Sequence, residues 1–160
     1  MKVAILPPFE EKVPPEKYGG TELIVYNLTE QMVAMGHDVT LFGTGDSRTS
    51  AKLEVIFDES IRNLPECQDA KIREIYKYIG VGRVISRLNK EKFDIVHNHI
   101  GWRVLPYSEL IKSPIITTLH GPLDAFYTQK TFGIFKDANY VSISRNQRKP
   151  MNDLNFVANV

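Results

Sequence analysis

Short apolar runs alternate with longer segments of helical periodicity along the whole chain, and this alternation limits the folds open to the sequence. Short apolar runs predict strands, and helical segments between them predict βαβ units, in which the strands are parallel. The runs are continuously apolar, which is typical of strands buried on both faces of a sheet. The sequence therefore predicts an α/β fold of three layers, α/β/α, around a mainly parallel sheet.

Each expected element follows from its local pattern. Strands are expected over Lys2–Leu6, Asp38–Phe42, Leu53–Phe57, Phe93–His97, Ile115–Leu119, Asn139–Ile143 and Asn155–Val160. Helices are expected over Glu22–Met35, Asp69–Asn89 and Val104–Ile111, with a helical turn over Ser144–Lys149, while Asp124–Phe135 fits no single pattern. The first helix is expected to end at Gly36. The apolar faces of the two long helices are expected to comprise Ile24, Leu28, Met32 and Met35, and Ile72, Ile75, Tyr76, Ile79, Val84, Ile85 and Leu88.

Length and composition set further limits. A chain of 160 residues predicts one domain, residues 1–160, and the formal net charge of +1 gives no indication of a nucleic-acid partner. The single cysteine, Cys67, excludes an intramolecular disulfide and is compatible with a reducing compartment. No apolar run is long enough to cross a bilayer. The sequence therefore predicts a cytoplasmic location and leaves open only a peripheral contact with a membrane.

The first candidate site is a glycine pair that opens a helix. In an open α/β sheet, ligands bind beyond the carboxyl ends of the strands, near the point where the strand order reverses. A long loop after the first expected strand leads to Gly19-Gly20-Thr21-Glu22. Glycines allow close backbone approach and a helix N-terminus favours anions, which suits a phosphate. An ordinary helix start, capped by Gly20 or Thr21 with Glu22 complementing the helix dipole, fits the same residues equally well.

The second candidate site is a set of histidines, because His97, His99 and His120 all fall at the carboxyl ends of expected strands. His97 and His99 are expected to point to opposite faces, and no third ligand at a recognisable spacing accompanies them, so a shared metal ion is not expected. Taken alone, each histidine also fits a hydrogen-bonded residue at a strand end. Basic residues in the same loops predict a positive rim suited to a phosphate-bearing ligand: Lys12, Lys17, Arg48, Arg103 and Arg145.

Several enzyme classes are disfavoured by motifs that the chain lacks. No G-x-G-x-x-G follows the first strand and no P-loop occurs, which argues against a nicotinamide-binding domain and a P-loop NTPase. Neither a G-x-S-x-G elbow nor a set of metal ligands at recognisable spacing is present. The sequence therefore argues against an α/β hydrolase and against a metal enzyme.

In this order and on this scaffold, the motifs resemble the N-terminal domain of the family-4 glycosyltransferases with a GT-B fold. The resemblance extends over nearly the whole chain. It is carried by Met1–Leu6 with its long loop, Gly19–Glu22, Gly36–Phe42, Phe93–His99, Thr117–Gly121 and Val141–Ser144.

The resemblance implies a function and roles for individual residues. Such enzymes have two Rossmann-like domains: the N-terminal one mainly binds the acceptor, and the C-terminal one holds the nucleotide-sugar. Transfer generally retains the anomeric configuration and needs no metal. The glycine loop lies near the donor phosphates and the acceptor. The resemblance assigns the contact with the transferred sugar to His120, and it implies further substrate-binding residues: Gly19, Gly20, Thr21, His97, His99, Gly121 and Arg145.

The chain departs from this family in one large respect, since the C-terminal domain does not follow Val160 in this sequence. Residues 1–160 are therefore expected to be a single Rossmann-like N-terminal domain, inactive alone, whose partner is the C-terminal domain of the same polypeptide. No cofactor is expected; the donor substrate would be a UDP- or GDP-sugar. Acceptor choice is expected in the loops Pro7–Tyr18 and Gly43–Ser50. The alternative is a free-standing, non-catalytic sugar- or phosphate-binding module.

Overall fold

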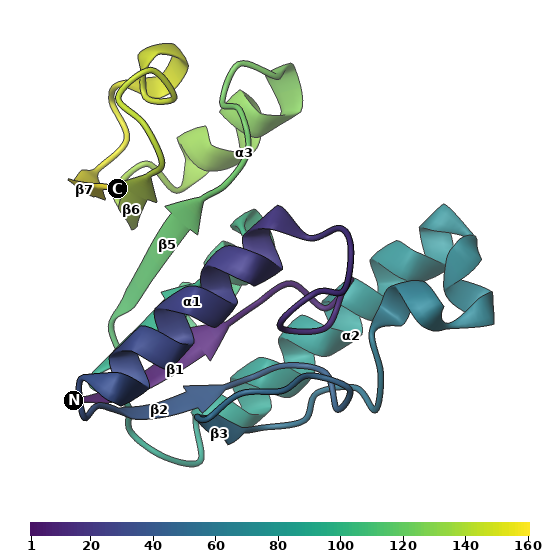
Figure 1. The fold of residues 1–160 in the computed structure, drawn as a ribbon. Coiled ribbons are helices and arrows are strands. Elements are labelled where there is room, and N and C mark those ends of the chain that lie inside the picture. Colours follow the sequence, from purple (N-terminus) through teal and green to yellow (C-terminus); the bar gives the residue numbers. More distant parts are fainter.

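The computed structural model describes residues 1–160 and contains one seven-stranded sheet in the order β3-β2-β1-β4-β5-β6-β7 (Figure 1). All neighbouring strands are parallel. The strands are β1 (Lys2–Leu6), β2 (Asp38–Leu41), β3 (Lys52–Leu53), β4 (Ile95–Asn98), β5 (Ile115–Leu119), β6 (Asn139–Ser142) and β7 (Phe156–Asn159).

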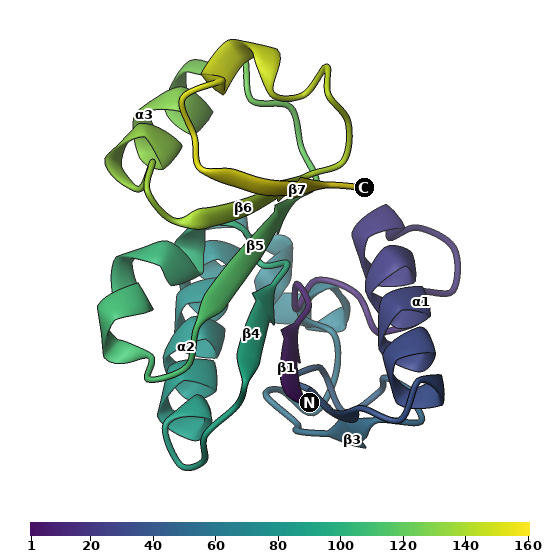
Figure 2. The ribbon, with the colours of Figure 1, turned by 90° about the vertical axis from the view of Figure 1, so that its left-hand side faces the viewer.

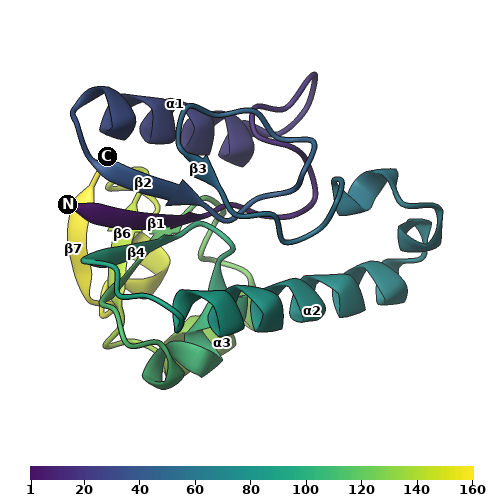
Figure 3. The same cartoon turned by 90° about the horizontal axis from the view of Figure 1, so that it is seen from below.

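Helices cover both faces of this sheet. They are α1 (Gly20–Ala34), α2 (Ala70–Leu88) and α3 (Phe126–Ile134), with short 3₁₀ segments η1 (Ile61–Asn63), η2 (Pro65–Gln68), η3 (Trp102–Leu110) and η4 (Lys149–Met151). α1 lies on one side of β1 and β2, and α2 lies on the other (Figure 3). The three-layer, Rossmann-like α/β fold that the sequence predicts is therefore confirmed.

The inner strand β1 shows why its own sequence has no alternation of apolar and polar residues. Its side chains Val3 and Ile5 belong to the cluster that contains Val25 of α1. The alternate side chains Ala4 and Leu6 belong to the cluster on the α2 side. All four are fully buried. A strand buried on both faces has no polar face, so its sequence lacks the alternation of a half-exposed strand.

Local residues explain where several elements begin and end. The carboxylate of Asp69 accepts hydrogen bonds from the amides of Lys71 and Ile72 and caps α2. Gly36 has a left-handed φ of 83° and follows α1, as expected. Pro106 lies inside the segment expected as a helix, and that segment is the 3₁₀ helix η3.

Two expectations are wrong in detail. The strand expected over Leu53–Phe57 is reduced to the short β3, and Phe57 contributes only an isolated bridge to Thr44. The apolar face expected for the first helix is right only in part, because Met32 packs against the core whereas Ile24 and Met35 are 48% and 71% exposed. Val25 and Thr29 face the sheet instead. Thr29 is accommodated because its hydroxyl donates to the carbonyl of Val25.

The strand order reverses between β1 and β4. β1 is followed in the chain by β2 on one side of it, whereas β4 starts the run toward the other edge of the sheet. Figure 2 shows β1 and β4 side by side, with α1 and α2 on opposite sides of them. The carboxyl ends of these two strands are therefore the position where an open α/β sheet binds its ligand. None of the helices is both long and apolar enough to cross a membrane.

Candidate functional site

The three histidines gather at the carboxyl ends of β4 and β5. His97 lies in β4, His99 follows it directly, and His120 follows β5. The ring centroids of His97 and His99 are 4.2 Å apart, and those of His99 and His120 are 5.1 Å apart. The expectation that His97 and His99 point to opposite faces is therefore wrong, because side chains two residues apart on extended backbone point to the same face.

Two hydrogen bonds hold these rings. Nε2 of His97 lies 2.7 Å from Oγ1 of Thr118, and Nδ1 of His99 lies 2.8 Å from Nε2 of His120. Burial lowers the pKa of His97 to about 4 and also lowers the pKa of His99 and of His120. The rings are therefore neutral at pH 7 and act as hydrogen-bonding groups rather than as cations. They are not arranged as a group of three or more ligands that could hold a metal ion.

Asn98 fixes the turn that follows β4, and it is fully buried. Its side-chain nitrogen lies 2.9 Å from the carbonyl oxygen of Gly101 and 3.1 Å from Oγ1 of Thr117, and its Oδ1 accepts from the amide of Ile100. Gly101 has a φ of 87°, which glycine adopts without strain. Asn98 and Thr117 were not among the site residues expected from the sequence. The available signal was a polar residue inside an apolar strand, because such a residue must be hydrogen-bonded.

Gln147 was also missed, although it holds the segment around His120. Its Nε2 donates to the carbonyl oxygens of Leu119 and Gly121, each at 2.7 Å. Its Oε1 accepts from the amide of Ile143 at 2.9 Å. Gly121, one of the expected substrate-binding residues, is exposed and is held through its backbone.

The two glycines before α1 differ in their surroundings. Gly19 is buried with a φ of 138°, and a Cβ there would lie 2.8 Å from Cβ of Pro15 and 2.9 Å from Oε2 of Glu22. Gly20 is exposed, and a Cβ there would meet nothing within 4 Å. Gly19 therefore shapes the loop, whereas Gly20 and the neighbouring Thr21 are the part of this motif open to a ligand.

Glu22 is enclosed rather than displayed at the start of α1, with 6% of its surface exposed. Burial raises the pKa of its carboxyl, and the nearby carboxylates of Glu11 and Glu10 act in the same direction. An acidic group beside Gly19 makes this helix start less favourable for a second anion than a bare helix N-terminus.

The expected positive rim is weaker than the sequence indicated, because ion pairs neutralise part of it. Lys12 pairs with Glu16, and Arg103 pairs with Glu74 at 2.7 Å. Arg145, an expected substrate-binding residue, lies exposed in the turn after β6 and forms no ion pair. Lys17 and Arg48 are likewise exposed and form no ion pair, so these three charges remain available to a ligand.

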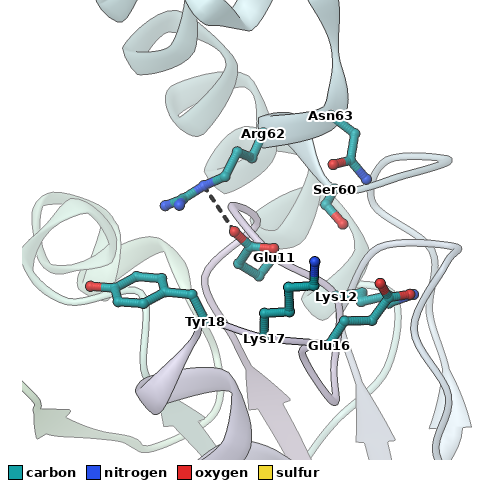
Figure 4. A pocket seen from close by; sticks show the side chains of 8 residues that line it. All are labelled: Glu11, Lys12, Glu16, Lys17, Tyr18, Ser60, Arg62 and Asn63. Carbon is teal, nitrogen blue, oxygen red and sulfur yellow. Dashed lines mark hydrogen bonds and ion pairs between the residues drawn. The ribbon is translucent and has the colours of Figure 1, made fainter.

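A cavity of about 320 Å³ lies beside the loop that connects β1 to α1 (Figure 4). Within it, the guanidinium of Arg62 lies 2.9 Å from a carboxylate oxygen of Glu11 and 5.6 Å from the ring centroid of Tyr18. Lys12 and Lys17 of the expected positive rim take part in its lining, and the lining is mostly charged or polar: Glu11, Lys12, Glu16, Lys17, Tyr18, Ser60, Arg62 and Asn63. The loop over Pro7–Tyr18 was also expected to take part in binding, and it supplies most of this lining.

Comparison with known proteins assigns the chain to a family. A search of curated proteins found no match. Among solved structures, AviGT4, a glycosyltransferase involved in avilamycin A biosynthesis, is similar with a TM-score of 0.59 and 19% identity, over 95% of this chain and 38% of that one. This similarity shows the shared fold. A sequence profile described as Glycosyltransferase Family 4 matches residues 18–151. The expected resemblance is thus confirmed, and the chain belongs to glycosyltransferase family 4.

Proposed function

We propose that the chain is the acceptor-side domain of a retaining glycosyltransferase, which transfers a sugar from a nucleotide-sugar to an acceptor. The observation that carries this proposal is the neutral histidine cluster, which lies at the switch point of the sheet. In the transfer, the bond between the anomeric carbon and the diphosphate oxygen breaks, and the diphosphate keeps the electron pair. A bond from the anomeric carbon to the acceptor oxygen forms, and the leaving diphosphate takes up the proton that the acceptor hydroxyl loses. His120 contacts the transferred sugar in this proposal.

The donor diphosphate is assigned mainly to a C-terminal domain of the same polypeptide, as the nucleotide-sugar site. A leaving diphosphate needs positive groups or hydrogen-bond donors placed for its charge. At this edge, Lys12 and Arg103 are already paired with carboxylates, and Glu22 lies beside Gly19. Residues 1–160 alone are therefore expected to bind UDP- or GDP-sugars weakly and to be inactive. No metal ion is assigned to the transfer.

The acceptor is assigned to the cavity beside Tyr18. Most of its lining is charged or polar, with both signs present. Such a surface suits hydroxyl groups and offers no site for a long apolar chain, whose transfer from water needs apolar contacts. The exposed ring of Tyr18 at its rim gives a flat apolar face against which a sugar ring can pack. We therefore assign the cavity to the polar, hydroxyl-bearing part of the acceptor.

Replacing His120 tests the function directly. In the complete polypeptide, His120→Ala is expected to lower turnover on the order of 100-fold, as for the loss of one group that stabilises the transition state. His37→Ala is the matched control, since His37 lies in the turn between α1 and β2, away from the cluster. Steady-state kinetics and thermal melting are measured for both variants. Unchanged turnover in a folded His120→Ala protein would contradict the proposed role, and absence of transfer by the unmodified polypeptide would favour a binding module.

A further inference from the structure

His99 is the most enclosed histidine of the cluster. Its side chain is only 4% exposed, and its Nε2 has no hydrogen-bond partner and no contact with solvent. Its amide donates to the carbonyl of Leu6 at 2.9 Å, and the ring of His97 lies against it. Backbone and neighbouring ring therefore hold His99 in place, with its Nδ1 directed at Nε2 of His120.

The hydrogen bond between these two rings restricts where their protons can be. Two neutral imidazoles that share one hydrogen bond have a single proton between the facing nitrogens. If His120 donated this proton, the proton of His99 would sit on Nε2 as a buried N–H without an acceptor. If His99 donates, its Nε2 is a bare nitrogen at the same place. Buried N–H groups without an acceptor are rarer in proteins than under-used acceptors, which favours donation by His99.

Donation by His99 determines which ring nitrogen of His120 carries its proton. With Nε2 of His120 accepting, the remaining proton of His120 sits on Nδ1. This nitrogen has no hydrogen-bond partner within the chain and is not among the buried unpaired atoms, so it reaches solvent. Burial lowers the pKa of both rings, which keeps the pair neutral. An uncharged N–H donor therefore stands at the edge of the site.

We propose that His99 is a positioning residue, which fixes His120 in the tautomer with the proton on Nδ1. His120 can then donate this proton in a hydrogen bond to an oxygen of the transferred sugar. The proposal rests on the function proposed above for the role of His120. The tautomer of a histidine is set by the hydrogen bond that its other nitrogen makes. Neutral imidazole in water prefers the proton on Nε2, so the tautomer proposed here needs such a partner.

Nuclear magnetic resonance of residues 1–160 with ¹⁵N-labelled histidine tests this assignment at neutral pH. Long-range ¹H–¹⁵N correlations distinguish a protonated from a bare ring nitrogen. In the unmodified chain, His120 is expected to have a protonated Nδ1 and a bare Nε2. His99→Leu is expected to shift His120 toward the Nε2–H form. His37→Leu is the matched control, because His37 lies in the turn between α1 and β2, outside the cluster, and it is expected to leave the tautomer unchanged.

Two results would overturn the proposal: a proton on Nε2 of His120 in the unmodified chain, or an unchanged tautomer in His99→Leu. If melting shows that His99→Leu does not fold, His99→Asn replaces it. The amide nitrogen of asparagine can take the place of Nδ1, so the Nδ1–H form of His120 is expected to persist, and its loss would count against the proposal. These outcomes are independent of turnover. A failure of the His120→Ala experiment with the tautomer as expected would reject the proposed function alone.

Discussion

At the scale of single residues, Gln147 joins two loops that the sequence places far from one another. Its side-chain nitrogen holds the carbonyl groups on both sides of His120, while its oxygen is held by the amide of Ile143. A neutral amide is the only uncharged side-chain group that offers two N–H donors together with an acceptor. The position of His120 therefore depends on Gln147, which acts only through its hydrogen bonds.

Gln147→Glu tests this dependence with almost no change of shape. A carboxylate at this position would place an acceptor against the carbonyls of Leu119 and Gly121, and both hydrogen bonds would be lost. The free energy of unfolding at pH 7 is expected to fall by about 1–3 kcal/mol. Gln129→Glu, on the exposed side of α3, is the control and is expected to change stability little. Equal urea midpoints for the two variants would show that Gln147 does not hold the site.

The sequence predicts the histidines of the site but not their partners. His97, His99 and His120 could be selected because strand ends lie at the same edge of a parallel sheet. Their hydrogen bonds depend on register, which places Asn98 beside Thr117 across two strands. Register is set by the packing of the whole sheet, so no local pattern indicates it. The cavity was missed for the same reason, since Arg62 and Tyr18 meet only in the folded chain.

At the scale of elements, α2 changes its surroundings along its length. The sequence predicts its ends within one residue, because Asp69 caps it locally. It predicts the buried face only in part, since Tyr76, Val84, Ile85 and Leu88 belong to the core or pack against it, whereas Ile75 and Ile79 are 52% and 43% exposed. The first half of α2 extends beyond the sheet (Figure 3), whereas Val84 and Leu88 in the second half are buried. Periodicity indicates which residues share a face, but not how far the sheet extends beneath them.

Substitutions at two glycines of α2 distinguish the effect of core packing on stability from the effect of helix propensity. A Cβ at Gly80 would lie 2.5 Å from Cε2 of Phe9 and 2.9 Å from Cε2 of Phe57, whereas one at Gly82 would meet nothing within 4 Å. Gly82→Ala is therefore expected to stabilise the protein by about 0.5–1 kcal/mol, through helix propensity alone. Gly80→Ala is expected to destabilise it by about 1–3 kcal/mol, because overpacking outweighs this gain. Urea denaturation of both variants measures the difference, and a stabilising Gly80→Ala would refute the close packing against Phe9.

At the scale of the whole molecule, the fold brings three neutral histidines together at the switch point of one sheet. β1, β4 and β5 are neighbours in space, although the last of them starts more than a hundred residues after the first. Burial of the three imidazoles lowers the pKa of each, because a protonated ring would be a cation without the hydration that it has in water. The geometry of the site is thereby linked to the stability of the entire domain.

This link predicts a loss of stability in mild acid. Below the unfolded pKa of 6.5, the unfolded chain binds protons on these histidines while the folded chain does not, so stability falls with pH until the folded pKa is reached. His97 has a folded pKa of about 4, and it is expected to lower the free energy of unfolding by about 2 kcal/mol between pH 7 and 5. The carboxyl of Glu22 acts in the opposite direction, because burial raises its pKa and protonation relieves it. The carboxyls of Glu10 and Glu74 have lowered pKa values and lose their contribution only in stronger acid.

Denaturation at pH 7, 6 and 5 distinguishes the histidine cluster from these carboxyls. His97→Asn removes the titrating ring and keeps a polar side chain beside Thr118. Between pH 7 and 5, the free energy of unfolding of this variant is expected to fall by about 2 kcal/mol less than that of the unmodified protein. His37→Asn, outside the cluster, is expected to follow the unmodified protein. If the curve of His97→Asn instead ran parallel to that of the unmodified protein, His97 would have to take up a proton equally readily in the folded and the unfolded state. A pKa of His97 lowered by burial would then be refuted.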